Sequence, residues 1–448
     1  MYKTYTILVR STNKEFLKYC SDSCQMAKLF RNSVIFRCRQ LITAHYKSKE
    51  GKVLSDNEKQ VLNEIKVLET KFPKLKEKTP FMLSANQFEH LFKLTDNSDF
   101  RNVVSSHSAA QMIQTVLSDF KSFWKAIKVY KVNPSVFTGK PELPSYCKSK
   151  ETTVTFTNQV CTIKNTDEGR FLAFPKTKLQ LPLGNLELGT LKEVEIVPYY
   201  NTYKITIVTE INNTNIIKTL DYSKCIGIDM GVQNIITTSN NFGVSPFIVK
   251  GNVLKSFNQW CNKKLSHMQS ELPQCIYTSW QIRQLMQYRN NYITDYFNKV
   301  ASKVISYAVE QNVGVIIIGI NHGWKQNVNN GKQNNQTFCY IPHSELANKI
   351  KSIGASYGIK VDIVEESYTS QASSIDGDIV PTYIKGDKTK YTFSGKRTKR
   401  GLYKTGEGIK MNADVNGATN IIRKHIPFAF DKITDFSYLT KQVKILAC

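Results

Sequence analysis

Residues 225–239 read CIGIDMGVQNIITTS, and the C-terminal half of the chain becomes an α/β sequence at this point. The apolar run before Asp229 predicts a buried strand, Gly231 predicts a turn, and NIITTS predicts a second strand. A carboxylate at the end of an apolar strand is costly if it is buried without a partner. Asp229 is therefore either a metal ligand on a central strand or a strand-terminal aspartate that serves the turn.

The segments that follow also alternate between helix and strand. Residues 281–311 and 343–357 predict helices, and the nearly continuous apolar run VGVIIIGIN at 313–321 predicts a strand covered on both faces. IKVDIVEE predicts another strand, and ADVNGATNIIRK predicts the last helix. Together with the hairpin around Asp229, this order fits a ribonuclease H-like α/β fold.

The N-terminal half combines strands with a helical block. Residues 2–10 alternate like a strand, residues from about 16 to 131 carry apolar side chains at helical spacing, and residues 151–220 return to an alternating β pattern. Ser106 and Ser108 are candidate N-caps of one helix. We expect a small antiparallel sheet or barrel, joined by the N-terminal strand, with a helical domain inserted into it.

The charge of the chain indicates a nucleic-acid partner. Lys and Arg number 61 against 36 Asp and Glu, which gives a net charge of +25. Such an excess favours a polyanion, and the alternative is a lysine-rich solvated surface. The N-terminus has no apolar run long enough for a signal peptide, and no stretch approaches the roughly 20 apolar residues of a membrane span. We therefore expect an intracellular soluble protein without a membrane partner.

The ten cysteines are scattered along the chain, and no C-x-x-C pair occurs. A zinc ribbon is therefore not predicted. Cys20 and Cys24 lie four residues apart in a predicted helix, where two buried thiols are favoured over a metal site.

Cutting a phosphodiester bond requires an in-line water and a stabilised leaving oxygen. Two magnesium ions roughly 3.5–4 Å apart provide both, and they need about three converging carboxylates. Asp229 and Asp414 offer two of them. Asp414 lies at a loop-to-helix boundary and is also a candidate N-cap, with Asn412 and Asn416 as possible hydrogen-bonding neighbours.

The third carboxylate is not found on the strand where it would first be expected. The strand VIIIGIN ends in Gly319 and Asn321 and offers no acid. The next strand ends in Glu365 and Glu366, and neighbouring side chains on a strand point to opposite faces. Only one of these two glutamates can therefore face the site.

Five motifs occur in order along the chain: IGIDMGVQNIITTS, VIIIGINHGWKQN, EESYTSQASS, KRGLYK and NADVNGATNIIRK. With the segment FWKAIKVYKVNPSVFTGKPELPSYCKSK at 123–150, they resemble the TnpB family of transposon-encoded RNA-guided nucleases, relatives of type V CRISPR effectors and Fanzor proteins. The resemblance spans about residues 100–425. It implies a RuvC nuclease domain with an Asp, Glu, Asp set, a wedge β-barrel domain interrupted by a helical recognition domain, and a guide RNA.

The resemblance implies roles for individual acids. Asp229 matches the first acid of the family and Asp414 matches the third. Glu366 matches a subgroup that places its glutamate just before the Y-T-S motif, with Glu365 in reserve. These residues are expected to bind two Mg²⁺ ions, for which Mn²⁺ can substitute.

The resemblance also implies domain boundaries. The wedge domain would cover residues 1–15 and 150–221, the recognition domain 16–149, the RuvC domain 222–369 and 411–448, and a target-nucleic-acid-binding insertion 370–410. Many relatives hold this insertion with zinc on two C-x-x-C pairs. Here Ser373 and Asp376 stand where the first pair would fall, and residues 377–424 contain no cysteine. We therefore expect no zinc, and the insertion must be held by other contacts or be mobile.

Basic residues interleaved with aromatic ones are candidate nucleic-acid contacts. Residues 385–410 carry seven Lys and two Arg against one Asp and one Glu, a net charge of +7. Phosphate neutralisation and base stacking suit a single-stranded target, and the alternative is a solvated basic loop. Trp324 and Lys325 could contact RNA or could belong to a packed loop. Trp124 is favoured as a core residue over a base-stacking one. The candidates are Lys396, Arg397, Lys399, Arg400, Lys404, Gln111, Lys125, Lys128, Trp324 and Lys325.

We therefore predict an RNA-guided DNA endonuclease that cuts double-stranded target DNA beside a short flanking motif, in a single RuvC site. The alternatives are a small type V CRISPR effector with the same chemistry and a nuclease-inactive RNA-guided DNA-binding regulator. The guide RNA would come from a transposon end or a repeat, and one monomer per guide RNA is favoured. The expected location is the bacterial cytoplasm, at the nucleoid, or the nucleus if the source is eukaryotic or viral.

Overall fold

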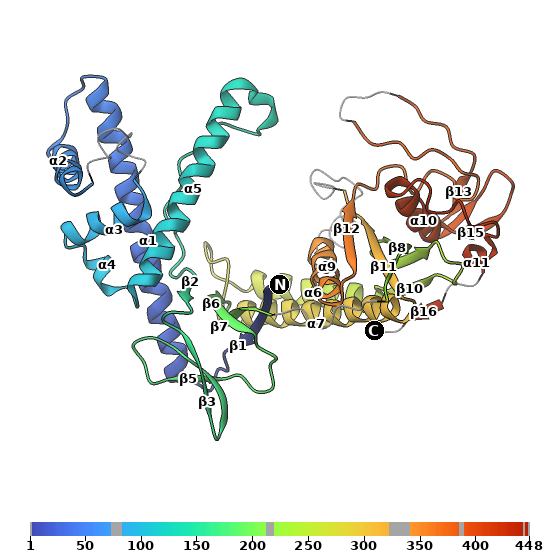
Figure 1. Cartoon of the computed structure of the whole chain (residues 1–448), viewed down its shortest axis with the longest axis horizontal. Helices are drawn as coiled ribbons and strands as arrows, with labels where there is room; N and C mark the ends of the chain where they lie inside the picture. Colours follow the sequence, from blue (N-terminus) through green and yellow to red (C-terminus); the bar gives the residue numbers. More distant parts are fainter. Residues whose placement is uncertain are drawn as a thin grey trace. The chain divides into compact units, whose positions relative to one another are not determined.

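The computed structural model describes residues 2–72, 83–211, 219–321, 341–384, 389–441 and 444–446. The chain divides into two compact units, Met1–Asn212 and Asn213–Cys448, and each is described by itself (Figure 1). The predicted mixture of α/β, β and α parts is confirmed. Within these ranges, no helix combines the length and the apolar character that crossing a membrane requires.

The first unit contains a block of helices that begin at polar caps. They are α1 (Lys14–Lys49), α2 (Asp56–Lys71), α3 (Ala85–Leu94), α4 (Ser98–Asn102), α5 (Ser106–Val132) and the 3₁₀ turn η2 (Pro134–Val136). The prediction that Ser106 or Ser108 caps α5 is wrong. The N-cap is Ser105, whose side chain accepts a hydrogen bond from the Ser108 backbone N–H. Cys20 and Cys24 are buried free thiols of α1, as predicted.

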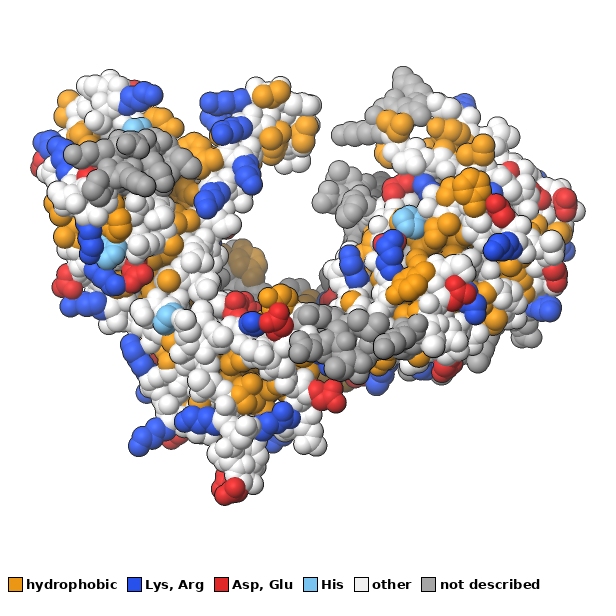
Figure 2. All heavy atoms as spheres, viewed as in Figure 1, with side chains coloured by type: hydrophobic (Ala, Val, Ile, Leu, Met, Phe, Trp, Pro, Cys, Tyr) orange, Lys and Arg blue, Asp and Glu red, His pale blue; other side chains and the backbone are white. Residues whose placement is uncertain are grey.

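Helix α5 carries a row of exposed lysines. They are Lys121, Lys125, Lys128 and Lys131. Their spacing of three or four residues places them on one face of the helix, and Figure 2 shows Lys and Arg side chains following this helix. The predicted contact residue Gln111 is half-buried on the same helix, and Trp124 packs against the core of the unit.

The strands of the first unit form two open sheets. The four-stranded sheet has the order β1 (Tyr2–Leu8), β7 (Thr202–Glu210), β6 (Thr190–Tyr199) and β2 (Val154–Thr157). The three-stranded sheet contains β3 (Thr162–Thr166), β4 (Gly169–Ala173) and β5 (Gln180–Pro182). The N-terminal strand joins the first sheet by pairing antiparallel with β7.

The predicted closed β-barrel is not found among the described strands, because β1 and β2 are the two edges of a sheet and do not pair with each other. The apolar face is covered by helices instead. Phe16 of α1 and Phe156 of β2 are fully buried in one core with residues of α5. A sheet whose apolar face is already covered by helices has no apolar surface left to bury by closing.

The second unit is built around a six-stranded sheet. Its strands are β8 (Asp221–Asp229), β9 (Asn234–Asn240), β10 (Phe247–Lys250), β11 (Val313–Gly319), β12 (Lys360–Val364) and β16 (Lys444–Leu446). Its helices are α6 (Asn252–Ser270), α7 (Trp280–Glu310), α9 (His343–Tyr357), α10 (Ala413–His425) and α11 (Ser437–Thr440). A three-stranded sheet contains β13 (Lys396–Lys399), β14 (Leu402–Lys404) and β15 (Lys410–Asn412).

The order of the six-stranded sheet is β12-β11-β8-β9-β10-β16. Strands β8, β9 and β10 are antiparallel neighbours, whereas β11 runs parallel to β8 and β12 runs parallel to β11. The carboxyl ends of β8, β11 and β12 therefore meet at one edge. Parallel strands that follow helical connections place ligand-binding residues at this kind of edge.

Strand β11 lies between two cores, which explains its continuous apolar sequence. Ile316 and Ile318 pack with residues of α7 and α9, and Val315 and Ile317 pack with residues of α10. Figure 1 shows α9 and α10 on opposite sides of the strands β8, β11 and β12. All seven residues of β11 are buried.

Helix α10 approaches β8 more closely than a side chain would allow. A Cβ atom on Gly227 would lie 2.3 Å from the Ala418 carbonyl oxygen and 2.6 Å from Ile422 Cγ1. On the helix side, a Cβ atom on Gly417 would lie 2.8 Å from Asp229 Oδ2. These two glycines let the start of α10 lie beside the end of β8.

We predict that Gly227→Ala displaces α10 and destabilises the second unit by about 1–3 kcal/mol, because the added methyl group meets backbone rather than a flexible side chain. Thermal unfolding and hydrogen exchange of the α10 peptides measure the effect. Gly139→Ala is the matched control, because a Cβ atom there would meet no described atom within 4 Å. Unchanged exchange in α10 of Gly227→Ala would contradict the close contact.

Candidate active site

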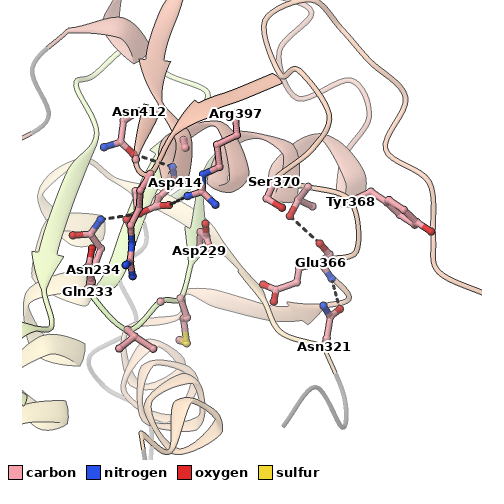
Figure 3. Close-up of a pocket in the computed structure, with 18 of the residues that line it drawn as sticks. Asp229, Gln233, Asn234, Asn321, Glu366, Tyr368, Ser370, Arg397, Asn412 and Asp414 are labelled. Carbon is pink, nitrogen blue, oxygen red and sulfur yellow. Dashed lines mark hydrogen bonds and ion pairs between the residues drawn. The ribbon is translucent and has the colours of Figure 1, made fainter. Parts of the chain in front are cut away.

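Three carboxylates line one pocket of about 740 Å³ at the carboxyl edge of β8, β11 and β12 (Figure 3). Asp229 is the last residue of β8, Glu366 follows β12 by two residues, and Asp414 is the second residue of α10. The structure thus brings the three predicted acids to one pocket. The reserve residue Glu365 is not among the residues that line it.

The two adjacent glutamates have different surroundings. The Glu365 carboxylate forms an ion pair with Lys424 and accepts a hydrogen bond of 2.7 Å from the Ser367 backbone N–H. The Glu366 backbone N–H donates to Asn321 Oδ1 at 3.0 Å, and its carbonyl oxygen accepts from the Thr369 hydroxyl at 2.8 Å. The backbone around Glu366 is therefore anchored on both sides, with its side chain directed into the pocket (Figure 3).

The Glu366 carboxylate occupies the space over Gly319. A Cβ atom on Gly319 would lie 2.8 Å from Glu366 Oε2 and 2.5 Å from Ile421 Cδ1. Gly319 ends β11 directly beside β8, since Ile318 pairs with Ile228. The glutamate from the segment that follows β12 thus fills the position toward which a side chain on β11 would project.

Asp414 is not the N-cap of α10. Asn412 has this role, because its side-chain oxygen accepts from the backbone N–H groups of Asp414 and Val415 at 2.9 and 3.1 Å. The Asp414 carboxylate is held instead by Arg397, which donates to Oδ1 at 3.0 Å, and by Asn234, which donates to Oδ2 at 2.7 Å. The alternative N-cap interpretation of Asp414 is therefore wrong.

Two buried asparagines of α10 fix the segment that follows Glu366. Asn416 was expected beside Asp414, but its amide donates to the Ala372 carbonyl at 2.8 Å and accepts from the Ser374 N–H at 2.9 Å. Asn420 donates to the carbonyls of Thr369 and Ala372 at 2.9 and 2.7 Å. This positioning role of Asn420 is not predicted from the sequence, although a polar residue within an apolar helix face is its signal.

The pocket brings acidic groups close together, and the pKa of two of them is raised. Burial raises the pKa of Asp229 well above its usual value, the charges of Glu366 and Asp414 raise it further, and Arg397 opposes the rise. Burial raises the pKa of Glu366 to about 7, with a contribution from Glu365 that Lys424 partly offsets. A divalent cation in this pocket would relieve the repulsion between the carboxylates.

The donor set fits magnesium in kind, because carboxylate and amide oxygens are the ligands that this ion prefers. Within the part of the chain that the structure describes, no three His, Cys, Asp or Glu side chains form a ready-made metal cluster. Both carboxylate oxygens of Asp414 already accept hydrogen bonds, from Arg397 and from Asn234. Ligation by Asp414 Oδ1 would require Arg397 to withdraw.

The predicted nucleic-acid contacts of the insertion lie on β13, on the turn that follows it and on β14. Lys396, Arg397, Lys399, Arg400 and Lys404 are all exposed. The side chains of two of them, Arg397 and Arg400, also line the acidic pocket. Trp324 and Lys325 lie outside the described residues.

A hydrogen-bonded cluster around Asp378 holds the segment that begins at Ser373. Asp378 Oδ2 accepts from the backbone N–H groups of Ser373 and Ser394 at 2.8 and 3.0 Å. Asp376 Oδ2 accepts from the Gly406 N–H at 2.6 Å, and Arg423 donates to the carbonyl of Asp378 at 3.0 Å. These bonds tie the beginning of the insertion to its β-strands and to α10.

Two family models match the chain. Residues 206–325 match the model OrfB_IS605, described as a probable transposase, and residues 343–421 match the model Cas12f1-like, TNB domain. The first segment includes Asp229, and the second includes Glu366, the basic strand β13 and Asp414. The predicted resemblance to the TnpB family is therefore confirmed over these two segments. Among curated proteins, none matches the chain.

Several solved structures are similar to the chain at low sequence identity. A cryo-EM structure of a Cas12f1–sgRNA–target DNA complex is 14% identical, with a TM-score of 0.49, over 91% of this chain and 82% of that one. A CRISPR–Cas12f ternary complex is 13% identical, with a TM-score of 0.34, over 92% and 85%. An AacC2c1–sgRNA binary complex is 9% identical, with a TM-score of 0.36, over 88% and 70%.

We predict that Asp378→Ala loosens the described part of residues 373–406, because it removes the charged acceptor of the Ser373 and Ser394 N–H groups at a cost of about 1–3 kcal/mol. Hydrogen exchange and limited trypsin cleavage at the lysines of β13 and β14 measure the effect, with the exposed Asp431→Ala as control. Burial alone would raise the pKa of Asp378, but hydrogen bonds from Ser394 and Ser373 lower it overall. The contribution is therefore complete at neutral pH and is lost as the pH falls below about 4.

Equal protection of residues 373–406 in Asp378→Ala and wild type would contradict this role of the cluster. The absence of zinc stays a prediction. Elemental analysis of the purified protein tests it separately, and one equivalent of bound zinc would contradict it.

Proposed function

We propose that the chain is an RNA-guided DNA endonuclease whose nuclease centre is the pocket lined by Asp229, Glu366 and Asp414. The observation that carries the proposal is the convergence of these three carboxylates on one pocket from three separate segments. The sheet order β12-β11-β8-β9-β10, with an antiparallel hairpin followed by parallel strands, supports a ribonuclease H-like domain of the RuvC type. The two matched family models support the link to guided nucleases.

The acids would hold the metal, and the basic residues beside them would hold the substrate. When bound, two Mg²⁺ ions would generate the attacking hydroxide and stabilise the leaving oxygen. Asp229, Glu366 and Asp414 are the proposed ligands. Arg397 and Arg400 line the same pocket and would neutralise the scissile phosphate, and a phosphate that attracts Arg397 would release Oδ1 of Asp414.

Aromatic residues next to the pocket support a single-stranded substrate. Tyr368 lines the pocket and packs edge-on against Tyr391 with ring centroids 5.2 Å apart, and Phe393 lies 6.4 Å away. Tyr368 has a φ of 63°, a left-handed conformation that non-glycine residues rarely adopt. Together with the two lysines and the arginine of β13, these rings offer unpaired bases a surface for stacking while the phosphates are neutralised.

One observation favours a second candidate function, that of a guided DNA-binding regulator that does not cut. The Arg397 guanidinium occupies an oxygen of Asp414, as a cation would in a pocket that binds no metal. A type V CRISPR effector would share the cleavage chemistry and differ in the origin of its guide.

The proposed partners are one guide RNA per monomer and double-stranded target DNA, with the lysine row of α5 as a candidate contact.

Purification of the protein with its co-expressed RNA tests the proposal. The RNA is sequenced, and Mg²⁺-dependent cleavage is measured on a library of matching targets with randomised flanks. Cleavage beside one flanking motif supports the endonuclease. Guided binding without cleavage supports the regulator.

We predict that Glu366→Gln lowers the cleavage rate at least about 100-fold, because a neutral amide replaces a carboxylate on which the developing charges depend. Glu365→Gln is the matched control. Its carboxylate faces Lys424 outside the pocket, so this variant should cut within a few-fold of wild type. The opposite result, in which Glu365→Gln is inactive and Glu366→Gln is active while both variants have the same thermal stability, would make Glu365 the metal ligand instead of Glu366.

We predict that the affinity of the free protein for Mn²⁺ rises at least about tenfold from pH 6 to pH 8. Glu366 has a pKa of about 7 without metal, so binding must displace a proton below this pH. Calorimetric titration at three pH values measures it, and Glu366→Gln should show a shallower dependence. An affinity independent of pH in wild type would contradict the raised pKa.

The same raised pKa has a consequence for the metal-free protein. The folded state holds a proton on Glu366 that the unfolded chain has lost between about pH 4.5 and 7, so this group reduces stability as the pH rises. The melting temperature of wild type should therefore fall relative to that of Glu366→Gln as the pH rises through this range. Above the range, the difference between the two should level off.

A further inference from the structure

Helices α6 and α7 form an antiparallel hairpin on the second unit, at a place that the acidic pocket does not include (Figure 1). The chain turns back between Ser270 and Trp280, so residues of α6 face residues of the first half of α7. Phe257 stacks on Tyr292 with ring centroids 3.9 Å apart, and Trp260 meets Tyr288 edge-on at 6.4 Å. These pairs set one register along the hairpin.

A separate cavity of about 480 Å³ opens between these two helices. Trp260 and Tyr288 line it and remain 47% and 55% exposed, so two large aromatic side chains face solvent at one place. The volume lies within the range of roughly 300–1,000 Å³ that is typical of small-ligand sites. Large aromatic side chains left exposed together indicate a binding surface more often than isolated ones do.

The aromatic surface is held by buried contacts beneath it. Arg289 Nε donates to Asn258 Oδ1 at 2.8 Å, and both residues are buried. The Tyr296 hydroxyl donates to the Lys250 carbonyl at 2.5 Å and fixes α7 against the end of β10. These contacts fix the two helices beneath the rings, so the backbone that carries Trp260 and Tyr288 is ordered before a ligand binds.

The residues around the cavity have the charge and the polar groups that suit a nucleotide. Lys264 lies over the Trp260 ring, with Nζ 5.3 Å from the centroid. Side-chain amides surround the rings: those of Gln281, Gln284, Gln287 and Asn291. No Asp or Glu is among the described residues that line the cavity. Residues 252–294 contain five Lys and Arg and one Glu, a net charge of +4.

We propose that this cavity binds an unpaired nucleotide of a single-stranded polynucleotide. The base stacks on the Trp260 face and meets Tyr288 edge to face, its polar edge meets the side-chain amides, and its phosphate pairs with Lys264. The amide-rich rim favours a base over an aliphatic protein segment, because amides paired with neither water nor a partner are costly to bury. The site goes beyond the proposed nuclease centre and does not depend on its chemistry.

The strand can come from RNA or from DNA, since both present the same bases and phosphates. Crosslinking distinguishes the two and locates the site directly. The full-length protein is irradiated with single-stranded oligonucleotides of about eight residues that contain 4-thiouridine in RNA or 4-thiothymidine in DNA, and the crosslinked peptides are identified by mass spectrometry. Crosslinks within α6 and the first half of α7 support the site, and the oligonucleotide that gives them identifies the source.

The affinity for the same oligonucleotide gives the second measurement. Trp260→Ala should weaken binding about 5- to 100-fold, as the loss of one stacked base does, and Trp260→Phe should restore most of it. Lys264→Ala should weaken binding and reduce its salt dependence. The matched controls are Tyr277→Ala and Lys263→Ala, which remove exposed side chains of the same hairpin outside the cavity and should bind as wild type.

Two results would overturn the proposal. One is crosslinking confined to other segments, with Trp260→Ala and Lys264→Ala binding as wild type. The other is a change of oligomeric state in Trp260→Ala at unchanged oligonucleotide affinity, which would assign the surface to a second copy of the chain. Neither result bears on cleavage, so the site can fail while the proposed nuclease stands, and the reverse.

Discussion

The contact between α10 and β8 is the constraint on which the second unit depends. It exists because neither Gly227 nor Gly417 has a side chain at the point where helix and strand meet. The start of the helix thereby places Asp414 beside the end of β8. Asn416 and Asn420, one and two turns along the buried face, hold the segment that follows Glu366. Helix α10 therefore carries Asp414 and anchors the segment after Glu366, so a shift of this helix would move these two carboxylates relative to Asp229 on β8.

The position of Glu366 shows how the segment after one strand can supply a carboxylate at the end of the neighbouring strand. Gly319 leaves room over the end of β11, and the glutamate of the neighbouring connection fills it. The charge collected there is balanced by Arg397 from the insertion and Lys424 from α10, which contact Asp414 and Glu365. Arg397 belongs to β13, so the insertion is electrostatically coupled to the acids. A movement of β13 would change the charge next to Asp414.

Much of the second unit could be predicted from the sequence, because its signals are local. The apolar run of β11 and the periodicity of α7 and α9 depend on neighbouring residues alone. The choice of Glu366 over Glu365 needed the family resemblance, since alternation on a strand says only that the two side chains differ in direction. The Arg397–Asp414 pair and the Asp378 cluster could not be predicted, because they depend on how irregular segments fold back on one another in space. The expected barrel failed for the same reason: whether edge strands pair depends on what covers the sheet.

The central claim is that Asp229, Glu366 and Asp414 share bound metal. Anomalous scattering from crystals of the protein with its guide RNA, grown or soaked with Mn²⁺, tests it most directly. The account predicts one or two manganese peaks within about 2.0–2.3 Å of oxygens of all three residues, with Arg397 displaced from Asp414. A peak bound by Glu365, or an intact Arg397–Asp414 pair with no manganese in the pocket, would contradict it.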